Sequence, residues 1–445
     1  MAIASPDSDP LAPLRTRGYV VLLVLAALLG VPLAAGAFGF LQLTQHMETW
    51  LYTSWPHALG YRSTPLWWPL PFLAFAGILV ALIVCYLPGI GGHEPADGFK
   101  VAGVAKGAEL PGILLAAVVS IGLGAVIGPE APLVALGGGA AALVIRTLKR
   151  GADQKTEEVV AAAGSFAAIS TLFGSPLSGA FLLMEASGLG GSALQIVLLP
   201  GLLASGIGAL IFVGLGSWTG LGSLSLTVSN PPHASSPTIA EFGWALVLGV
   251  GCALLGLLIK RCALMLRRPV ALSTRTRLLL TPVAGLGVAG LAIAYAEGSG
   301  HALNDVLFSG QTGLGPLISS GAAYSIGALV LLLVCKGLAY CLSMAAFRGG
   351  PVFPSLFLGA AAGMLLSHAA GLSMAAGVAM GIGALSAALL ALPMTSVLLV
   401  ALLLGRTGLT VLPLVIVAVL VSHVLSVRLA APRTATAGPS AAPRS

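Results

Sequence analysis

Long apolar runs separated by short polar segments make up most of this chain of 445 residues. Several runs reach the length of about 20 residues that an α-helix needs to cross the hydrocarbon core of a bilayer. The predicted spans are Gly18 to Leu43, Pro65 to Leu87, Gln195 to Gly214, Phe242 to Leu266, Leu278 to Tyr295, Ile318 to Cys341 and Leu409 to Val427. This pattern predicts an all-α integral membrane protein.

Other apolar runs are too short to span a bilayer comfortably, and they occur in pairs. Val159 to Phe173 precedes Pro176 to Glu185, and Met374 to Leu392 precedes Pro393 to Leu404. A half-helix is tolerated at membrane depth only where protein or a cavity covers its end. We therefore expect these segments to be half-helices buried within the protein.

Each half of the chain carries a copy of one longer pattern. The first copy, Gly128-Pro129-x-x-Pro132-x-x-x-Leu136-Gly137, matches Gly350-Pro351-x-x-Pro354-x-x-x-Leu358-Gly359 in the second. Further along, Pro176-Leu177-Ser178-Gly179 corresponds to Pro393-Met394-Thr395-Ser396. Matches in the same order at similar separations indicate a transporter built from two repeats, whose broken helices meet near the middle of the bilayer.

A single carboxylate, Glu130, interrupts an otherwise uncharged region at the first copy of the pattern. The runs on either side, Leu110 to Ile127 and Leu133 to Ile145, carry no charge. A carboxylate inside a bilayer costs about 2.5–3.5 kcal/mol on insertion scales and is therefore a candidate functional residue. The alternative is an interfacial glutamate that caps a helix, and the neighbouring prolines fit either interpretation. The second copy of the pattern favours a functional role.

Composition and charge agree with placement in a membrane. Hydrophobic residues make up 57% of the chain and charged residues only 8%, with a net charge of +7. The basic residues form short clusters between apolar runs, which indicates cytoplasmic loops and not a nucleic-acid-binding surface. We expect cytoplasmic tails at 1–17 and 428–445, membrane repeats at 18–215 and 241–427, and an external loop at 216–240. The C-terminal tail is expected to be disordered and too short to hold a cytosolic nucleotide-binding domain.

The sequence gives little support for metal or redox chemistry. None of the five cysteines has CxxC spacing, and their apolar surroundings indicate small packed side chains. His93 and Glu94 are adjacent, but no HExxH pattern or second ligand follows, so a polar cytoplasmic loop is favoured over a metal site. We predict no metal and no cofactor.

Three glycine-rich breaks are expected to bring helix N-termini together: Gly89 to Gly92, Gly128 to Ala131 and Gly349 to Phe353. A helix N-terminus carries about half a positive charge and free N–H donors. Several such ends would bind a dehydrated anion without a full cation, weakly enough for the anion to leave again. Glu130 would compete for this position when ionised and vacate it when protonated or displaced.

These segments resemble the CLC chloride channel and transporter family between about Gly18 and Val427. The family motif G-[KR]-E-G-P, which holds its gating glutamate, is similar to Gly128-Pro129-Glu130-Ala131-Pro132. The motif G-x-F-x-P is similar to Gly350-Pro351-Val352-Phe353-Pro354, and G-S-G-I-P is loosely similar to Gly89-Ile90-Gly91-Gly92-His93. The motif around Pro176-Leu177-Ser178-Gly179 is close to the family form.

The resemblance implies a CLC-type fold of two inverted-topology repeats with broken half-helices. The chain would be a divergent bacterial-type member without cytosolic CBS domains, and would form a homodimer. Glu130 would be the gating residue. The residues implied to bind the anion are Ile90, Gly91, Gly92, Gly128, Ala131, Val352 and Phe353.

The chain departs from the family where the anion would bind. The family's serine that donates a hydroxyl to the anion falls at Ile90. The family's second hydroxyl donor, a tyrosine in the C-terminal region, has no counterpart, because no tyrosine follows Tyr340. Pro351 has no N–H to donate. The family's inner proton-transfer glutamate aligns with Ala186, one residue after Glu185. These departures predict weak selectivity among anions. They also predict transport that is uncoupled, or loosely coupled, to protons, with only a weak proton path at Glu185 and Ala186.

The sequence therefore predicts a multi-pass permease of the cell membrane that passes chloride or other small monovalent anions, with both termini cytoplasmic. One alternative is a proton-coupled anion antiporter that uses Glu130 and Glu185. An intramembrane enzyme would need a nucleophile–base pair or a complete metal set, and we find neither in the sequence. A non-conducting scaffold would leave Glu130 unexplained.

Overall fold

Helices form nearly all of the regular structure in the computed structural model, which describes residues 12–99, 105–148, 154–188, 191–221, 227–228 and 231–430. Within these ranges the chain contains no β-strand, and one isolated antiparallel bridge joins Gly128 to Gly350. The prediction of an all-α protein is confirmed.

The first half of the chain begins with a helix much longer than the predicted span. Its helices are α1 (Arg17–Thr49), α2 (Trp55–Ala58), α3 (Pro69–Tyr86), α4 (Leu110–Gly122), α5 (Glu130–Leu148), α6 (Gln154–Phe173), α7 (Pro176–Ser187) and α8 (Gly191–Thr219). A π-helical turn, Trp50–Ser54, links α1 directly to α2, so the polar residues after Leu43 continue the helix instead of ending it. The predicted N-terminal tail is also partly helical, because Ala12–Arg15 forms a 3-10 turn; residues 1–11 lie outside the described part.

The second half repeats the alternation of long and short helices. It contains α9 (Ile239–Ala271), α10 (Thr274–Ser299), α11 (Leu314–Ser319), α12 (Ile326–Ala346), α13 (Val352–Leu366), α14 (Met374–Leu390), α15 (Pro393–Leu404), α16 (Arg406–Thr410) and α17 (Leu412–Leu429). The predicted span from Ile318 to Cys341 is wrong in its first part, because a 3-10 turn at Gly321–Ala323 separates α11 from α12. Residues 431–445 of the predicted C-terminal tail lie outside the described part.

The short helices agree with the predicted half-helices in three of four cases. Helices α7 and α15 have 12 residues each, and α14 has 17. The fourth, Val159 to Phe173, is part of α6, which begins five residues earlier and has 20 residues, although α6 is not among the described segments that are long and apolar enough to cross a membrane. The first five residues of α6, Gln154 to Glu158, are polar or charged. The apolar pattern from which the helix was predicted begins only after them.

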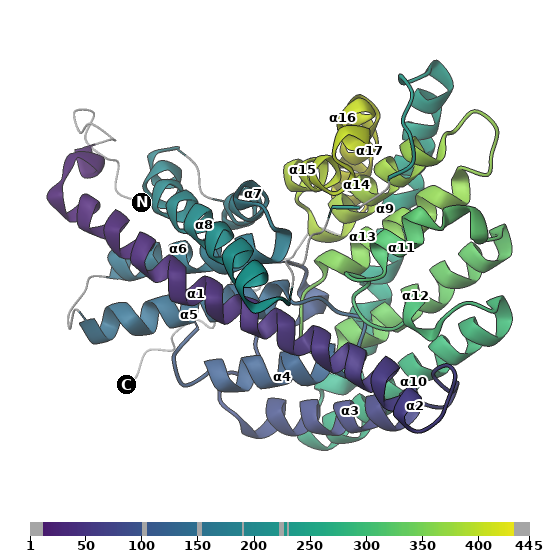
Figure 1. The fold of residues 1–445 in the computed structure, drawn as a ribbon, viewed down its shortest axis with the longest axis horizontal. Coiled ribbons are helices and arrows are strands. Elements are labelled where there is room, and N and C mark those ends of the chain that lie inside the picture. The colour runs from purple at the N-terminus through teal and green to yellow at the C-terminus, as the bar shows by residue number, and fades with distance from the viewer. Residues whose placement is uncertain are drawn as a thin grey trace, which may run out of the picture.

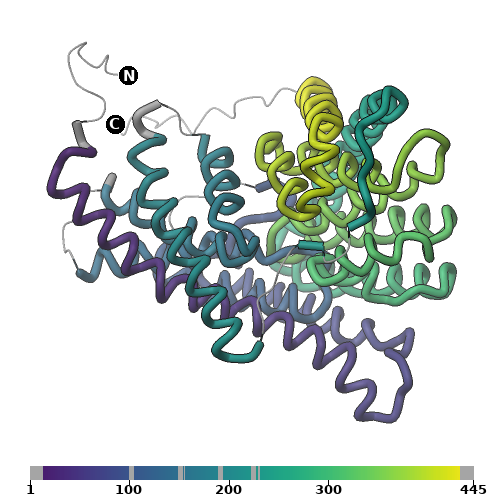
Figure 2. Tube along the Cα trace, turned by 45° about the horizontal axis from the view of Figure 1, so that its top comes forward, coloured from purple at the N-terminus to yellow at the C-terminus, as the bar shows by residue number. Residues whose placement is uncertain are grey.

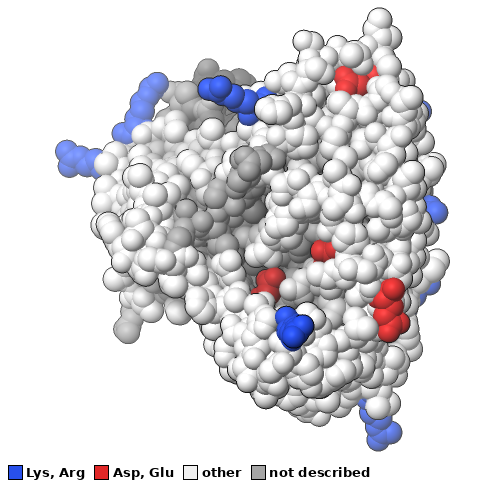
Figure 3. All heavy atoms as spheres, turned by 45° about the vertical axis from the view of Figure 1, so that its right-hand side comes forward, with Lys and Arg blue, Asp and Glu red and all other residues white. Residues whose placement is uncertain are grey.

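The arrangement of helices is that of a multi-pass membrane protein. Within the described ranges, eight helical segments are long and apolar enough to cross a membrane, and α4, α13, α14 and α15 are shorter apolar helices. In Figures 1 and 2, α5 to α8 lie on one side and α9 to α17 on the other, while the long α1 runs obliquely across the first group. Few charged side chains appear on the face shown in Figure 3, as expected for a surface that contacts lipid.

The last glycine of the repeated pattern has the same packing role in both halves. A Cβ atom added at Gly137 on α5 would lie 2.3 Å from the carbonyl oxygen of Gly164 on α6, and one added at Gly359 on α13 would lie 2.4 Å from that of Gly381 on α14. Only glycine fits at such distances, so the two backbones touch, as small residues allow in membrane helix pairs. This contact holds α5 against α6 and α13 against α14.

Candidate functional site

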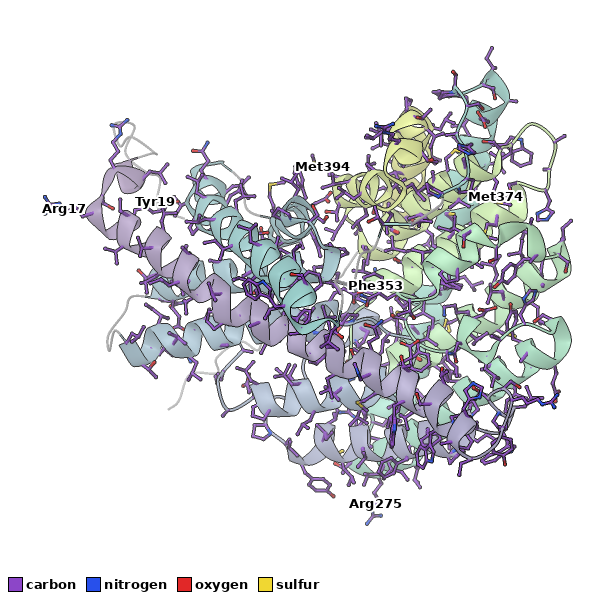
Figure 4. The ribbon with its side chains drawn as sticks, in the orientation of Figure 1. Arg17, Tyr19, Arg275, Phe353, Met374 and Met394 are labelled. Atoms are coloured by element: carbon purple, nitrogen blue, oxygen red, sulfur yellow. The ribbon has the colours of Figure 1, made fainter. Side chains whose placement is uncertain are left out.

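The two Gly-Pro segments, Gly128-Pro129 and Gly350-Pro351, cross each other in the interior of the protein. The N–H of Gly128 donates to the carbonyl oxygen of Gly350 over 2.7 Å, and the N–H of Gly350 donates to the carbonyl oxygen of Gly128 over 2.6 Å. Phe353, at the start of α13, lies between the two groups of helices in Figure 4. The crossing brings together the N-termini of α5 and α13, as the repeats predict.

Two further hydrogen bonds give this crossing an approximate two-fold symmetry. The N–H of Val126 donates to Ser343 Oγ on α12 over 3.0 Å, and the N–H of Arg348 donates to Ser120 Oγ on α4 over 3.2 Å. Each broken segment is thus tied to the helix that precedes the other break. Because all four residues are buried, these bonds satisfy backbone donors that water cannot reach.

Glu130 places its carboxylate at the start of α13. Its side chain is fully buried, and Oε1 accepts a hydrogen bond of 2.9 Å from the N–H of Phe353. The two glycines of the crossing make room for it: a Cβ atom added at Gly128 would lie 2.3 Å from Oε1, and one added at Gly350 would lie 1.7 Å from Oε2. A glutamate of the first repeat therefore caps the helix N-terminus of the second, where a negative charge is favoured.

The first turns of α5 and α13 have the same donor arrangement. Pro132 and Pro354 occupy the third helical position in each, where a missing N–H costs nothing because that donor would have no partner within the helix. The remaining N–H groups, at Glu130 and Ala131 and at Val352 and Phe353, are those a small anion would meet. Two convergent helix N-termini make this a suitable site for an anion.

The second carboxylate oxygen of Glu130 has no hydrogen-bond partner among the described residues. Aromatic rings lie beside it: Phe173 stacks on Phe353 with ring centroids 6.0 Å apart. The nearby Tyr340 hydroxyl donates to the carbonyl oxygen of Pro351 over 2.9 Å. Tyr340 is thus engaged with the backbone beside the site. A half-satisfied buried carboxylate is costly to keep ionised, which favours its protonation or departure.

A cavity of about 820 Å³ leads from the surface to this crossing. Ala131 and Gly349 line its inner end, and the exposed residues Arg146 and Gln154 line its rim. The predicted anion-binding residues Ile90, Gly91 and Gly92 also line it. The structure therefore brings the three predicted breaks together, two at the crossing and one along the cavity wall.

The prediction that a helix begins at the Gly89 to Gly92 break is wrong within the described residues. These residues have positive φ, including Ile90 at 47°, and only a three-residue 3-10 turn, Pro95–Asp97, follows before residue 99. The Ile90 side chain is 60% exposed and does not point into a packed site. This segment offers a curved loop along the cavity and not a third helix N-terminus.

Glu185 makes contacts that the sequence did not predict. Its carboxylate accepts hydrogen bonds from the N–H of Met394 at 2.9 Å, and from the N–H and hydroxyl of Thr395 at 2.7 and 2.6 Å. It therefore caps the N-terminus of α15, which has no side-chain cap of its own. The neighbouring Ala186 is partly buried and has no titratable group.

Two buried cations were not assigned a role from the sequence. Lys336 on α12 donates to four consecutive carbonyl oxygens, those of residues 305 to 308, at 2.9 to 3.3 Å, and lies 4.2 Å from the centre of the Phe357 ring. Arg348 lies two residues before Gly350 of the second Gly-Pro segment and lines the cavity. Both are lone charges in apolar stretches, which is the same signal that singled out Glu130. No group of three His, Cys, Asp or Glu side chains in the described ranges could hold a metal ion.

Sequence comparison relates the chain to ion-transport proteins. The family model described as voltage gated chloride channel matches residues 96–427. A relative from Salmonella schwarzengrund (strain CVM19633), named "Putative ion-transport protein YfeO", is 26% identical over 364 residues, which cover 79% of this chain and 82% of the relative. The protein of the same name from Salmonella paratyphi A (strain ATCC 9150 / SARB42) is 27% identical over 360 residues, with the same coverage.

Solved structures with the same fold support this relationship. A slow cyanobacterial Cl-/H+ antiporter superposes with a TM-score of 0.70 at 19% identity, covering 92% of this chain and 95% of that one. A eukaryotic CLC transporter gives a TM-score of 0.70 at 18% identity, covering 93% and 73%. A CLC-type fluoride/proton antiporter gives 0.65 at 19% identity, covering 92% and 95%. At these identities the superpositions establish the fold alone, but the family model spans well over half of the sequence. The chain therefore belongs to the voltage gated chloride channel family, the CLC family that its motifs resemble.

Proposed function

We propose that this protein lets chloride and other small monovalent anions cross the membrane, and that Glu130 is its gate. The observation that carries the proposal is the fully buried Glu130 carboxylate, which accepts the N–H of Phe353 at the helix N-terminus where an anion would bind. A carboxylate and a chloride ion compete for the same donors. The ionised side chain therefore closes the path, and its protonation or displacement opens it.

The path that we propose runs from the cavity lined by Ala131 and Gly349 to the crossing of the two Gly-Pro segments. The anion is held there by backbone N–H groups of α5 and α13 and by the partial positive charge of both helix ends. No full cation touches Glu130 among the described residues, so binding stays weak enough for release.

Weak selectivity among anions follows from the same donors. The position of the family's serine is Ile90, whose side chain is 60% exposed, and Pro351 has no N–H. A site made of helix ends and apolar contacts replaces little of the hydration shell of chloride. Anions that lose water easily, such as nitrate and thiocyanate, therefore compete well.

Transport uncoupled from protons is our proposal for the mode of movement. Glu185, the carboxylate nearest to the expected inner proton path, is held by Met394 and Thr395 at the start of α15, and Ala186 does not titrate. The alternative is a proton-coupled antiporter, which the titles of two structural neighbours support, since they name a Cl-/H+ and a fluoride/proton antiporter.

We also propose that the protein works as a homodimer with one path in each subunit, placed in the cell membrane with both termini on the cytoplasmic side. The basic clusters between the spans support this orientation. Transport and not intramembrane catalysis is supported by the names of the relatives and fold neighbours above, which are those of ion-transport proteins and antiporters.

The experiment is chloride efflux from liposomes that contain the purified protein, with proton movement recorded at the same time. Glu130→Gln keeps the shape of the side chain and removes its charge, so we expect efflux to rise or to lose its dependence on pH. Glu297→Gln, at an exposed position on α10, is the matched control and should behave as the wild type. Unchanged efflux and an unchanged pH response in folded Glu130→Gln would refute the gate. Uphill proton movement at a fixed ratio to chloride would establish the antiporter.

A further inference from the structure

Arg348 is a buried guanidinium at the inner end of the cavity. Its residue is only 3% exposed, and it lines the cavity together with the adjacent Gly349. Gly349 in turn precedes Gly350, which forms the crossing with Gly128. The Glu130 carboxylate packs against Gly350. Arg348 therefore places a full positive charge two residues before that contact.

The guanidinium keeps unused hydrogen-bonding capacity. Nε donates to the carbonyl oxygen of Ile90 at 3.3 Å, Nη1 to that of Phe347 at 3.3 Å, and Nη2 to Glu94 Oε1 at 3.1 Å. An arginine has five N–H donors, so these three bonds with described residues leave two. A planar group that lines a cavity with two spare donors is suited to bind an anion.

Glu94, the acidic partner of Arg348, is held independently by other cations. Its Oε2 lies 2.9 Å from Arg267 Nη1, and Arg277 Nη2 lies 3.9 Å from Oε1. Arg267 also pairs with Asp97 at 2.9 Å. This network joins three arginines to two carboxylates and so has a net charge of +1. An anion can therefore replace Oε1 at Arg348 while Glu94 stays paired with Arg267.

The charge breaks the approximate two-fold symmetry of the crossing. The residue that corresponds to Arg348 in the first repeat is Val126, because each lies two positions before the paired glycine and each N–H donates to a serine of the opposite repeat. Only the second repeat places a cation there, and that cation lines the cavity. The guanidinium contacts the loop at Ile90, where the family has its serine. It donates to the carbonyl oxygen of Ile90, because this residue has no hydroxyl group.

We propose that Arg348 binds the transported anion at the inner end of the cavity, in exchange with Glu94 Oε1, before the anion reaches the crossing, and so raises the affinity of the protein for small monovalent anions. This inference rests on the anion permeation proposed above. Glu130 and Glu94 are then two carboxylates, one at the crossing and one at the cavity, that each give way to the same passing ion.

The first test measures how chloride efflux from liposomes depends on chloride concentration. Arg348→Met keeps much of the volume and removes the charge. We expect the half-saturating chloride concentration to rise roughly tenfold or more, because a hydrogen bond to a charged group contributes about one to two powers of ten in affinity. Arg348→Lys should recover part of this loss. Arg268→Met removes the same charge at an exposed position on α9, next to Arg267, and should change nothing.

The second test separates anion binding from a purely structural role of the ion pair. If Arg348 binds the anion in exchange with Glu94, Glu94→Gln weakens the competitor and lowers the half-saturating chloride concentration. If the pair only holds the loop in place, Glu94→Gln raises that concentration or lowers the maximal rate, as Arg348→Met does. Opposite shifts in the two variants support the proposal, and shifts in the same direction overturn it. If Arg348→Met does not fold, the direction of the Glu94→Gln shift decides alone.

A binding measurement keeps this inference independent of transport. Bromide titrated calorimetrically into the detergent-solubilised protein should bind at least tenfold more weakly to Arg348→Met than to the wild type. An affinity within twofold of the wild type would overturn the proposal. If the wild type bound bromide through Arg348 but carried no anion across liposomes, the proposed function would fail and this inference would stand.

Discussion

Adding one methyl group at Gly350 should open the anion path by expelling the Glu130 carboxylate. In Gly350→Ala the new Cβ would lie 1.7 Å from Glu130 Oε2 and 2.8 Å from Cδ, whereas ordinary contacts between such atoms are about 3.5–4 Å. The backbone at Gly350 is fixed by its paired hydrogen bonds to Gly128, so the side chain of Glu130 has to move.

The size of the effect follows from the contact that Glu130 loses. Leaving the site breaks the 2.9 Å hydrogen bond from the N–H of Phe353. A hydrogen bond to a charged group is worth about 1.5–3 kcal/mol, which corresponds to roughly a 10- to 150-fold rise in the ratio of displaced to bound carboxylate. Chloride efflux from liposomes should therefore approach that of Glu130→Ala.

The assay compares three variants at equal amounts of folded protein. Gly350→Ala should raise efflux, the double variant with Glu130→Ala should add nothing further, and Gly337→Ala should match the wild type because no atom lies within 4 Å of a Cβ at that glycine of α12. Reduced or unchanged efflux in folded Gly350→Ala, beside a faster Glu130→Ala, would show that the carboxylate does not block the path.

The remaining predictions concern pH, stability and selectivity. Efflux by the wild type should increase as the pH falls, because protonated Glu130 no longer competes with the anion, and Glu130→Gln should remove this dependence; a pH series on liposomes checks both. Glu185→Ala should lower the free energy of unfolding by about 1–2 kcal/mol through the lost cap of α15, while efflux per folded molecule stays the same; thermal unfolding measures the first effect, and a coupled loss of proton movement would contradict a structural role. Lys336→Met should destabilise the protein by about 1–3 kcal/mol or more, since it leaves buried carbonyl oxygens without a donor, and unfolding in denaturant would show this. Nitrate and thiocyanate should compete with chloride in efflux, and a chloride preference of about a hundredfold or more would contradict a site made of helix ends.

Much of the fold could be predicted because membrane helices must satisfy their own backbone. Long apolar runs therefore become helices, and the proline at position 393 starts α15 where the sequence places it. The ends of helices were harder to predict where charge begins inside a helix. Helix α6 begins at the polar Gln154, and α1 continues through polar residues to Thr49. Both helices therefore extend beyond the apolar stretches from which they were predicted.

The sequence identified the residues at the centre of the candidate site but not the contacts that surround them. Glu130 and the Gly-Pro repeats were recognisable because a lone charge and a repeated pattern are local signals. The partners of Glu185 on α15 lie 209 and 210 residues away along the chain. The bond from Arg348 to Glu94 spans 254 residues. Such contacts depend on how the two repeats pack, and no local periodicity encodes that arrangement.

The crossing of the two Gly-Pro segments has a consequence for how the protein is made. Glu130 and Phe353 are 223 residues apart, and the serine contacts on either side span 217 and 228 residues. A ribosome that adds about 5–20 residues per second needs roughly 10–45 s to travel from one member of the pair to the other. During that interval the carboxylate has been synthesised without its helix partner. The contact that we propose as the gate therefore forms late in biogenesis, after most of the polypeptide has been made, and a nascent chain stopped before α13 would hold Glu130 without the N–H that binds it.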